Sequence, residues 1–227
     1  MPCRPNRFLG CLLGLCLLAT GCEEPLTQPP PEPAIDSAEA VVAALVRAYQ
    51  QRDPDLLGSI LANDADNNAA YLFLLSEPTE TGETQWKYAE EARIHKRMFH
   101  PEKPPPGDRP VPAEVWLQSL SIALTQNESF SERPDLYTQN GGADGKLDPA
   151  LWRATDATYA ADLFFDLAGD TDYLVECIAN FVVIENLQKN EGNTGKFLLF
   201  IWEDIDASKP LPSLGAASLG LIKQLYR

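Results

Sequence analysis

Residues 152–187, which read WRATDATYAADLFFDLAGDTDYLVECIANFVVIENL, carry the clearest strand pattern in the chain and decide its fold. Up to residue 167, apolar and polar side chains alternate, which is the period of a strand with one buried face. The turn Ala168-Gly169-Asp170 then predicts a tight hairpin with a second strand over 172–187. The apolar face carries Tyr159, Leu163, Phe165 and Leu167, and the opposite face mostly carries Asp156, Thr158, Asp162 and Asp166.

The segments on either side extend this hairpin into an antiparallel meander. Residues 190–195 predict a turn into a last strand over 196–206, which contains FLLFIW. This strand is apolar on both faces, so both faces need a cover. We expect helices on one face, and on the other either the C-terminal segment 216–227 or a second subunit. An earlier strand is indicated by Trp116, Leu120, Ile122 and Leu124.

The segments that precede the meander are predicted to be mainly helical. Asp36 predicts the start of a helix over 36–51, and Asp53, followed by proline, predicts the start of a second helix. A short buried strand is expected over 71–75 and a third helix over 83–99. Helices followed by a strongly curved sheet define an α+β fold.

This order of elements resembles the NTF2-like superfamily, which includes SnoaL-like proteins. The resemblance rests on VRAYQQRDPDLLGSILAND at 46–64, which looks like the opening helical hairpin of that group, and on GKFLLFIWEDI at 195–205, which looks like its last strand. It implies a cone, in which N-terminal helices pack on a strongly curved antiparallel sheet around a pocket. Members include enzymes and binding proteins, so the fold does not choose a function. No position here matches a catalytic motif of an enzymatic branch.

Three residues are candidates for acid/base chemistry: His95 on the apolar side of the third predicted helix, and Asp162 and Glu176 on neighbouring strands. Imidazole exchanges a proton near neutral pH, and a carboxylate on an apolar face has a raised pKa. The alternatives are a core histidine bonded to a backbone carbonyl, and carboxylates that are solvated or contact arginine. An enzyme requires at least two of the three to face one cavity.

Four aromatic residues are candidates for lining an apolar ligand pocket, with packing inside the cone as the alternative: Trp86, Trp116, Tyr159 and Trp202. The sequence holds no His/Cys set with metal-ligand spacing. Residues 140–151 resemble a calcium loop, but Leu151 stands where that loop needs a bidentate glutamate. We therefore expect no metal and no cofactor.

The first 22 residues predict export and a lipid anchor. Arg4 and Arg7 precede an apolar run over 8–19, which is shorter than the ~20 residues of a membrane span. The segment LATGC at 18–22 resembles a bacterial lipobox, in which the cysteine receives lipid, although leucine is more usual where Ala19 stands. Simple secretion and a retained anchor are the alternatives.

The chain is thus predicted to have three parts: a lipoprotein signal peptide over 1–21, a lipidated Cys22 with a proline-rich tether over 22–35, and an NTF2-like domain over 36–227. The tether favours extended polyproline II. Glu23, rather than aspartate, after the cysteine favours the outer membrane, facing the periplasm. We therefore expect the protein in the bacterial cell envelope, held to the membrane through the lipid on Cys22.

The composition limits the partners. A net charge of −15 at pH 7 argues against nucleic acid and anionic lipid head groups, and favours cationic partners. Outside the signal peptide and the lipidated cysteine, Cys177 is the last cysteine left, so no internal disulfide is expected.

Two functions fit these observations. The first is a cell-envelope lipoprotein whose NTF2-like module binds a small apolar ligand or a protein partner without catalysis. The absence of a matched catalytic pair favours it. The second is a SnoaL-type isomerase, cyclase or dehydratase with acid/base residues in the cone pocket. We also expect a homodimer through the second face of the sheet, or an envelope protein partner there.

Overall fold

Strands β5 (Trp152–Leu167) and β6 (Tyr173–Asn186) form the long hairpin at the centre of an eight-stranded sheet. The main path through the sheet is β2-β1-β7-β6-β5-β3, with β4 beside β5 and β8 beside β6. The β1–β7 and β6–β8 pairs are parallel and the others are antiparallel. The other strands are β1 (Leu72–Leu74), β2 (Gln85–Lys87), β3 (Leu117–Gln126), β4 (Ser131–Glu132), β7 (Phe197–Ala207) and β8 (Gly215–Ala216).

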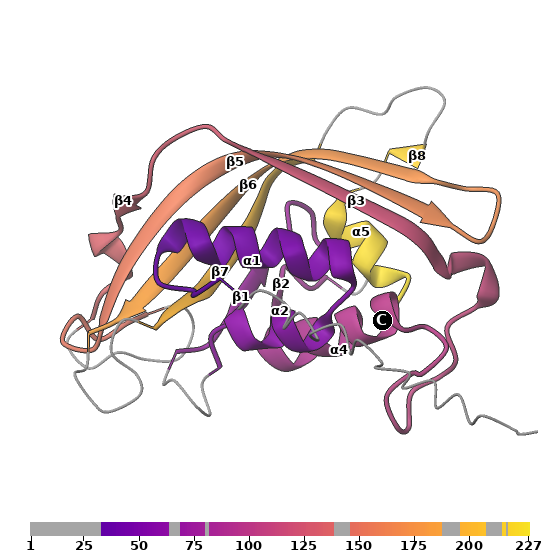
Figure 1. Ribbon diagram of the computed structural model, residues 1–227, viewed down its shortest axis with the longest axis horizontal. Coiled ribbons are helices and arrows are strands. Elements are labelled where there is room, and N and C mark those ends of the chain that lie inside the picture. Colours follow the sequence, from indigo (N-terminus) through magenta and orange to yellow (C-terminus); the bar gives the residue numbers. More distant parts are fainter. Residues whose placement is uncertain are drawn as a thin grey trace, which may run out of the picture. The chain divides into compact units, whose positions relative to one another are not determined.

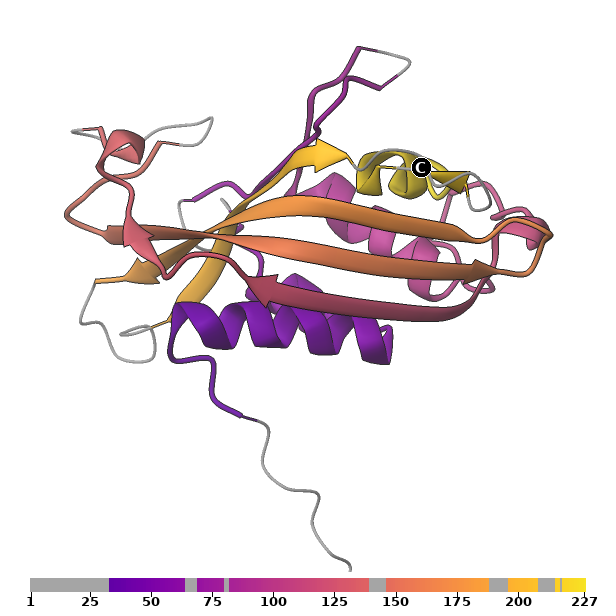
Figure 2. The same cartoon turned by 90° about the horizontal axis from the view of Figure 1, so that it is seen from above.

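The sheet arches over the helices, which lie on its concave side (Figure 1). Seen from above, β3, β5 and β6 run across the helical layer (Figure 2). The expected α+β architecture, with helices packed on a strongly curved antiparallel sheet, is confirmed. The helices are α1 (Ala38–Gln51), α2 (Pro54–Ile60), α4 (Tyr88–Phe99) and α5 (Leu219–Gln224), with short 3-10 turns at Ala113–Val115 and Pro134–Leu136.

The computed structural model describes residues 33–63, 69–79, 82–138, 146–187, 196–207, 215–216 and 218–227. The predicted signal peptide, Cys22 and most of the tether lie outside the described residues, as does the first half of the segment that resembles a calcium loop. Residues Pro33–Arg227 form one compact unit.

The first two helices begin close to where the sequence predicts. Asp53 caps α2 by accepting hydrogen bonds from the backbone N–H of Asp55 (3.0 Å) and Leu56 (2.8 Å), as expected. The cap of α1 is Ser37 rather than Asp36, because the Ser37 hydroxyl accepts from the backbone N–H of Ala40. The prediction for this cap was wrong by one residue.

The third predicted helix, over 83–99, is wrong at its start. Residues 85–87 form β2, and the helix α4 begins only at Tyr88. The reason is tertiary: Trp86 is opposite Phe73 of β1, and the two rings stack with centroids 5.5 Å apart. In this pairing Trp86 is fully buried.

Both faces of the first half of β7 are covered within the chain. Trp202 faces the helices, where its ring contacts Tyr49 of α1 and lies 4.5 Å from the ammonium of Lys223 in α5. The C-terminal helix therefore joins the other helices on the concave side, instead of covering the opposite face. On that opposite face, Leu198 and Ile201 are only 1% and 7% exposed.

Candidate functional site

His95 lies inside the helical layer and is fully buried. Its Nδ1 is 2.9 Å from the carbonyl oxygen of Glu91, one turn earlier in α4. A carbonyl only accepts, so Nδ1 carries the proton and Nε2 accepts from the Tyr49 hydroxyl at 2.7 Å. Burial is the main reason that the pKa of His95 lies well below 6.5, and the positive charge of Lys223 lowers it further. His95 is therefore a neutral core histidine, satisfied by a backbone carbonyl and a tyrosine.

Asp162 and Glu176 lie on the other face of the sheet. They are direct cross-strand neighbours in β5 and β6, and both are exposed. Ala161 and Leu163, on either side of Asp162, are buried toward the helices, so the carboxylates point to the convex side. The structure brings the two carboxylates together but keeps both away from His95. The three candidates do not share a cavity.

Three of the four aromatic candidates belong to one packed cluster. Trp202 contacts Phe73 and Phe181, with centroids 5.5 and 5.2 Å away, and Phe181 contacts Tyr159. Trp86 stacks on Phe73. Trp116 lies elsewhere, partly exposed, with its indole N–H donating to the carbonyl of Val111. Trp86, Tyr159 and Trp202 are at most 5% exposed, so they pack against protein.

The sequence did not reveal the ion pair inside this cluster. Lys223 of α5 and Glu91 of α4 form a salt bridge with both side chains at most 1% exposed. The Lys223 ammonium also lies 3.6 Å from the ring centroid of Phe73, a cation–π contact. The two charges are far apart in the sequence, so only packing decides that they meet.

Burial opposes both charges of this pair. It raises the pKa of Glu91, and Lys223 counteracts that rise. It lowers the pKa of Lys223, and Glu91 counteracts that fall. Tyr71 lies close to Glu91, and burial raises the pKa of its phenol well above 10.0. Tyr49, Tyr71, Glu91, His95 and Lys223 thus form a polar cluster in the interior of the domain, without solvent contact.

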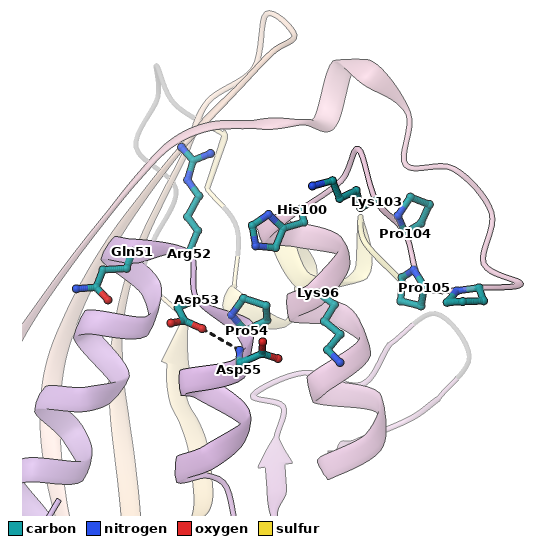
Figure 3. Close-up of a pocket in the computed structure, with 11 residues that line it drawn as sticks. Gln51, Arg52, Asp53, Pro54, Asp55, Lys96, His100, Lys103, Pro104 and Pro105 are labelled. Carbon is teal, nitrogen blue, oxygen red and sulfur yellow. Dashed lines mark hydrogen bonds between the residues drawn. The ribbon is translucent and has the colours of Figure 1, made fainter. Parts of the chain in front are cut away.

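An open pocket of about 680 Å³ lies outside the cone, where α1 ends and α2 begins (Figure 3). Arg52 has a left-handed conformation there, with φ of 52°, and ends α1. Its guanidinium donates to the carbonyl oxygens of Leu117, at 2.9 Å, and Gln118. The far wall consists of the end of α4 and the loop after it. The lining residues are Gln51, Arg52, Asp53, Pro54, Asp55, Lys96, His100, Lys103, Pro104, Pro105 and Pro106.

Cys177 and the groups of His, Cys, Asp and Glu side chains are the remaining places to look for site chemistry. Cys177 is free and buried, and burial raises the pKa of its thiol to about 12, which makes it unreactive. Among the residues that the structure describes, no group of three or more His, Cys, Asp or Glu side chains could hold a metal ion.

No family model and no curated protein matches this chain. Two of the similar solved structures are a proposed aromatic ring hydroxylase from Novosphingobium aromaticivorans and a proposed dehydratase from the NTF2-like family from Streptomyces avermitilis. The first has 13% identity and a TM-score of 0.41, over 76% of this chain and 87% of that chain. The second has 11% identity and a TM-score of 0.40, over 74% and 93%. Neither likeness assigns a residue or an activity to this chain.

Proposed function

We propose that this protein is a lipid-anchored binding module of the bacterial cell envelope, without catalytic activity. Cys22 would hold it to the membrane and the proline-rich segment would carry the domain away from the surface. A ligand or partner would bind to the outside of the domain. One observation carries this proposal: Glu91, His95 and Lys223, polar groups of the domain interior, are at most 1% exposed and are held by partners within the protein, so they are closed to a substrate.

The placement of the acid/base candidates supports a binding role over the SnoaL-type alternative. An acid and a base must reach one substrate at hydrogen-bond distance. His95 has no solvent access, while Asp162 and Glu176 face outward from the sheet. Two neighbouring carboxylates on an exposed sheet face are better suited to contact a cationic partner than to exchange protons with an enclosed substrate.

The convex face of the sheet is the surface that we propose for a second copy or an envelope protein. Ile178 and Ile205 are 38% and 49% exposed there, next to the carboxylates of Asp162 and Glu176. An apolar area with a charged border is typical of protein contact surfaces.

The lipid anchor is expected from the sequence alone. No helix in the described part of the chain is long and apolar enough to cross a membrane. The anchoring would therefore depend on Cys22, whose acyl chains each contribute ~0.8 kcal/mol per buried methylene.

The anchor is tested by cell fractionation of the full-length protein. We expect Cys22→Ser to move the protein from the membrane fraction to the soluble periplasmic fraction. Cys16→Ser is the matched control, because Cys16 lies in the predicted signal peptide, and it should leave the protein in the membrane fraction. If the Cys22→Ser protein stays with the membrane, the proposed anchoring is wrong.

A further inference from the structure

Helices α2 and α4 lie side by side and border a groove on the outside of the cone. The groove consists of the pocket of about 680 Å³ and a second pocket of about 330 Å³. Both pockets are lined by Pro54, Asp55 and Lys96, so they adjoin each other. The second pocket extends along the helices to Tyr88 and Lys196.

The charge of this groove is opposite to that of the chain. Acidic residues outnumber lysine and arginine by 33 to 18 in the whole sequence. In the groove the ratio is reversed, with Arg52, Lys96, Lys103 and Lys196 against Asp53 and Asp55. A local excess of positive charge on a strongly acidic protein favours an anion at this place.

The hydrogen bonds show which of these charges are available. The Arg52 guanidinium is bound to two carbonyl oxygens, and the Asp53 carboxylate caps α2. In contrast, Lys96 and Lys103 make no side-chain hydrogen bond or salt bridge with any described residue, and both are exposed. Two ammonium groups that line one pocket are thus free to bind a ligand.

Proline rings form a stiff, apolar part of the wall. Pro54, Pro104, Pro105 and Pro106 line the larger pocket. Figure 3 shows the labelled members of this group on two sides of the pocket, with Lys103 rising from the same loop as Pro104 and Pro105. Proline rings lose little conformational freedom on binding, so such a wall lowers the entropic cost of holding an apolar group.

We propose that this groove binds a small organic anion, whose carboxylate or phosphate is held by Lys96 and Lys103 while its apolar part lies against the prolines. This inference rests on the proposed function, since it names the class of ligand that the binding module takes up. The ligand is amphiphilic because proline rings and two free ammonium groups line the same pocket, while the exposed Asp55 carboxylate lines the wall at the start of α2. Binding weakens as salt is added, because exposed charges are screened over about 10 Å at 0.1 M ionic strength.

Phenylphosphate is the probe, titrated by calorimetry into the full-length protein in a neutral maltoside detergent. We expect binding that falls on the order of five-fold for Lys96→Met and again for Lys103→Met, as for a charge contact of about 1 kcal/mol. Lys146→Met is the matched control, because Lys146 is exposed, lies outside the groove and carries the same charge. It should leave the affinity unchanged. Phenol, which lacks the anion, should bind much more weakly than phenylphosphate.

Three results would overturn the proposal. The first is no binding of phenylphosphate to the wild-type protein. The second is equal binding by the wild type and the Lys96→Met/Lys103→Met variant. The third is that the Cys22→Ser protein binds vesicles of phosphatidylcholine and phosphatidylglycerol through these lysines but does not bind phenylphosphate. That result would assign the site to a lipid head group. None of them depends on the fractionation of Cys22→Ser, so the anchor and the groove fail or hold separately.

Discussion

Helix α4 has two polar sides with opposite surroundings. Toward the sheet it presents Glu91 and His95, which are at most 1% exposed and have fixed partners. Toward the groove it presents Lys96, which is exposed and has no side-chain partner among the described residues. The same helix therefore contributes to a closed polar network and to an open pocket.

The difference separates groups that hold the fold from groups that are available to a ligand. When one charge of a buried pair is removed, the other stays buried without solvation or a partner. Losing either charge therefore costs much free energy. An exposed lysine is solvated before and after it binds a ligand, so gaining or losing the contact changes the free energy of the protein little. For this reason we assign stability to the inner side of α4 and binding to its outer side.

The largest effect that we predict is on the inner side, for Lys223→Met. The change keeps the size of the side chain and leaves the Glu91 carboxylate buried without a cation. We expect the free energy of unfolding to fall by about 3–5 kcal/mol, measured by urea denaturation at neutral pH. Replacing both partners, as Glu91→Leu/Lys223→Met, should restore part of the loss. A loss below about 1 kcal/mol for the single variant would show that the pair is not closed to water.

The next effect is the pH dependence that His95 contributes. Its pKa is lowered in the folded state, so the protein keeps it neutral while the unfolded chain takes up a proton below pH 6.5. The unfolded state then binds more protons, and the free energy of unfolding falls as the pH falls below 6.5, by up to about 1.4 kcal/mol per pH unit.

The comparison with His95→Gln isolates this contribution from that of Glu91, whose raised pKa acts in the opposite direction. Urea denaturation from about pH 7.5 to about pH 5 should show a steeper loss for the wild type than for the variant. Parallel pH profiles for the two proteins would mean that His95 is protonated in the folded state.

The smallest effect is on the outer side, for Lys96→Met/Lys103→Met. Both side chains are exposed and unpaired, so we expect the free energy of unfolding to change by less than about 0.5 kcal/mol. The same urea denaturation measures it, with Lys146→Met as the reference. A loss comparable to that of Lys223→Met would abolish the contrast between the two sides of α4.

Local patterns predicted most of the elements. The alternation over 152–167 and the turn at 168–170 predicted the hairpin of β5 and β6, because side-chain period and turn residues are properties of neighbouring positions. The cap of α2 at Asp53 was predicted for the same reason. Strand β2 was missed, because Trp86 is held there by a distant partner, Phe73.

The candidate sites show the limit of such patterns. Asp162 and Glu176 were correctly expected on neighbouring strands, but their side of the sheet depends on where the helices pack. Glu91 has no pattern that marks it as buried, since it stands beside Glu90 in a charged stretch of α4. The groove joins residues from 51 to 106 with Lys196, and nothing in the local sequence indicates that they meet.

The sequence by itself determined the main helices, the long hairpin and the buried face of β5, because these depend on contacts between nearby residues. Only the tertiary structure decided that Lys223 meets Glu91 inside the cone while Lys96 and Lys103 stay free outside it. Charge is visible in a sequence, but desolvation depends on the surrounding elements. The same residue type can therefore stabilise the core at one position and remain available to a ligand at another.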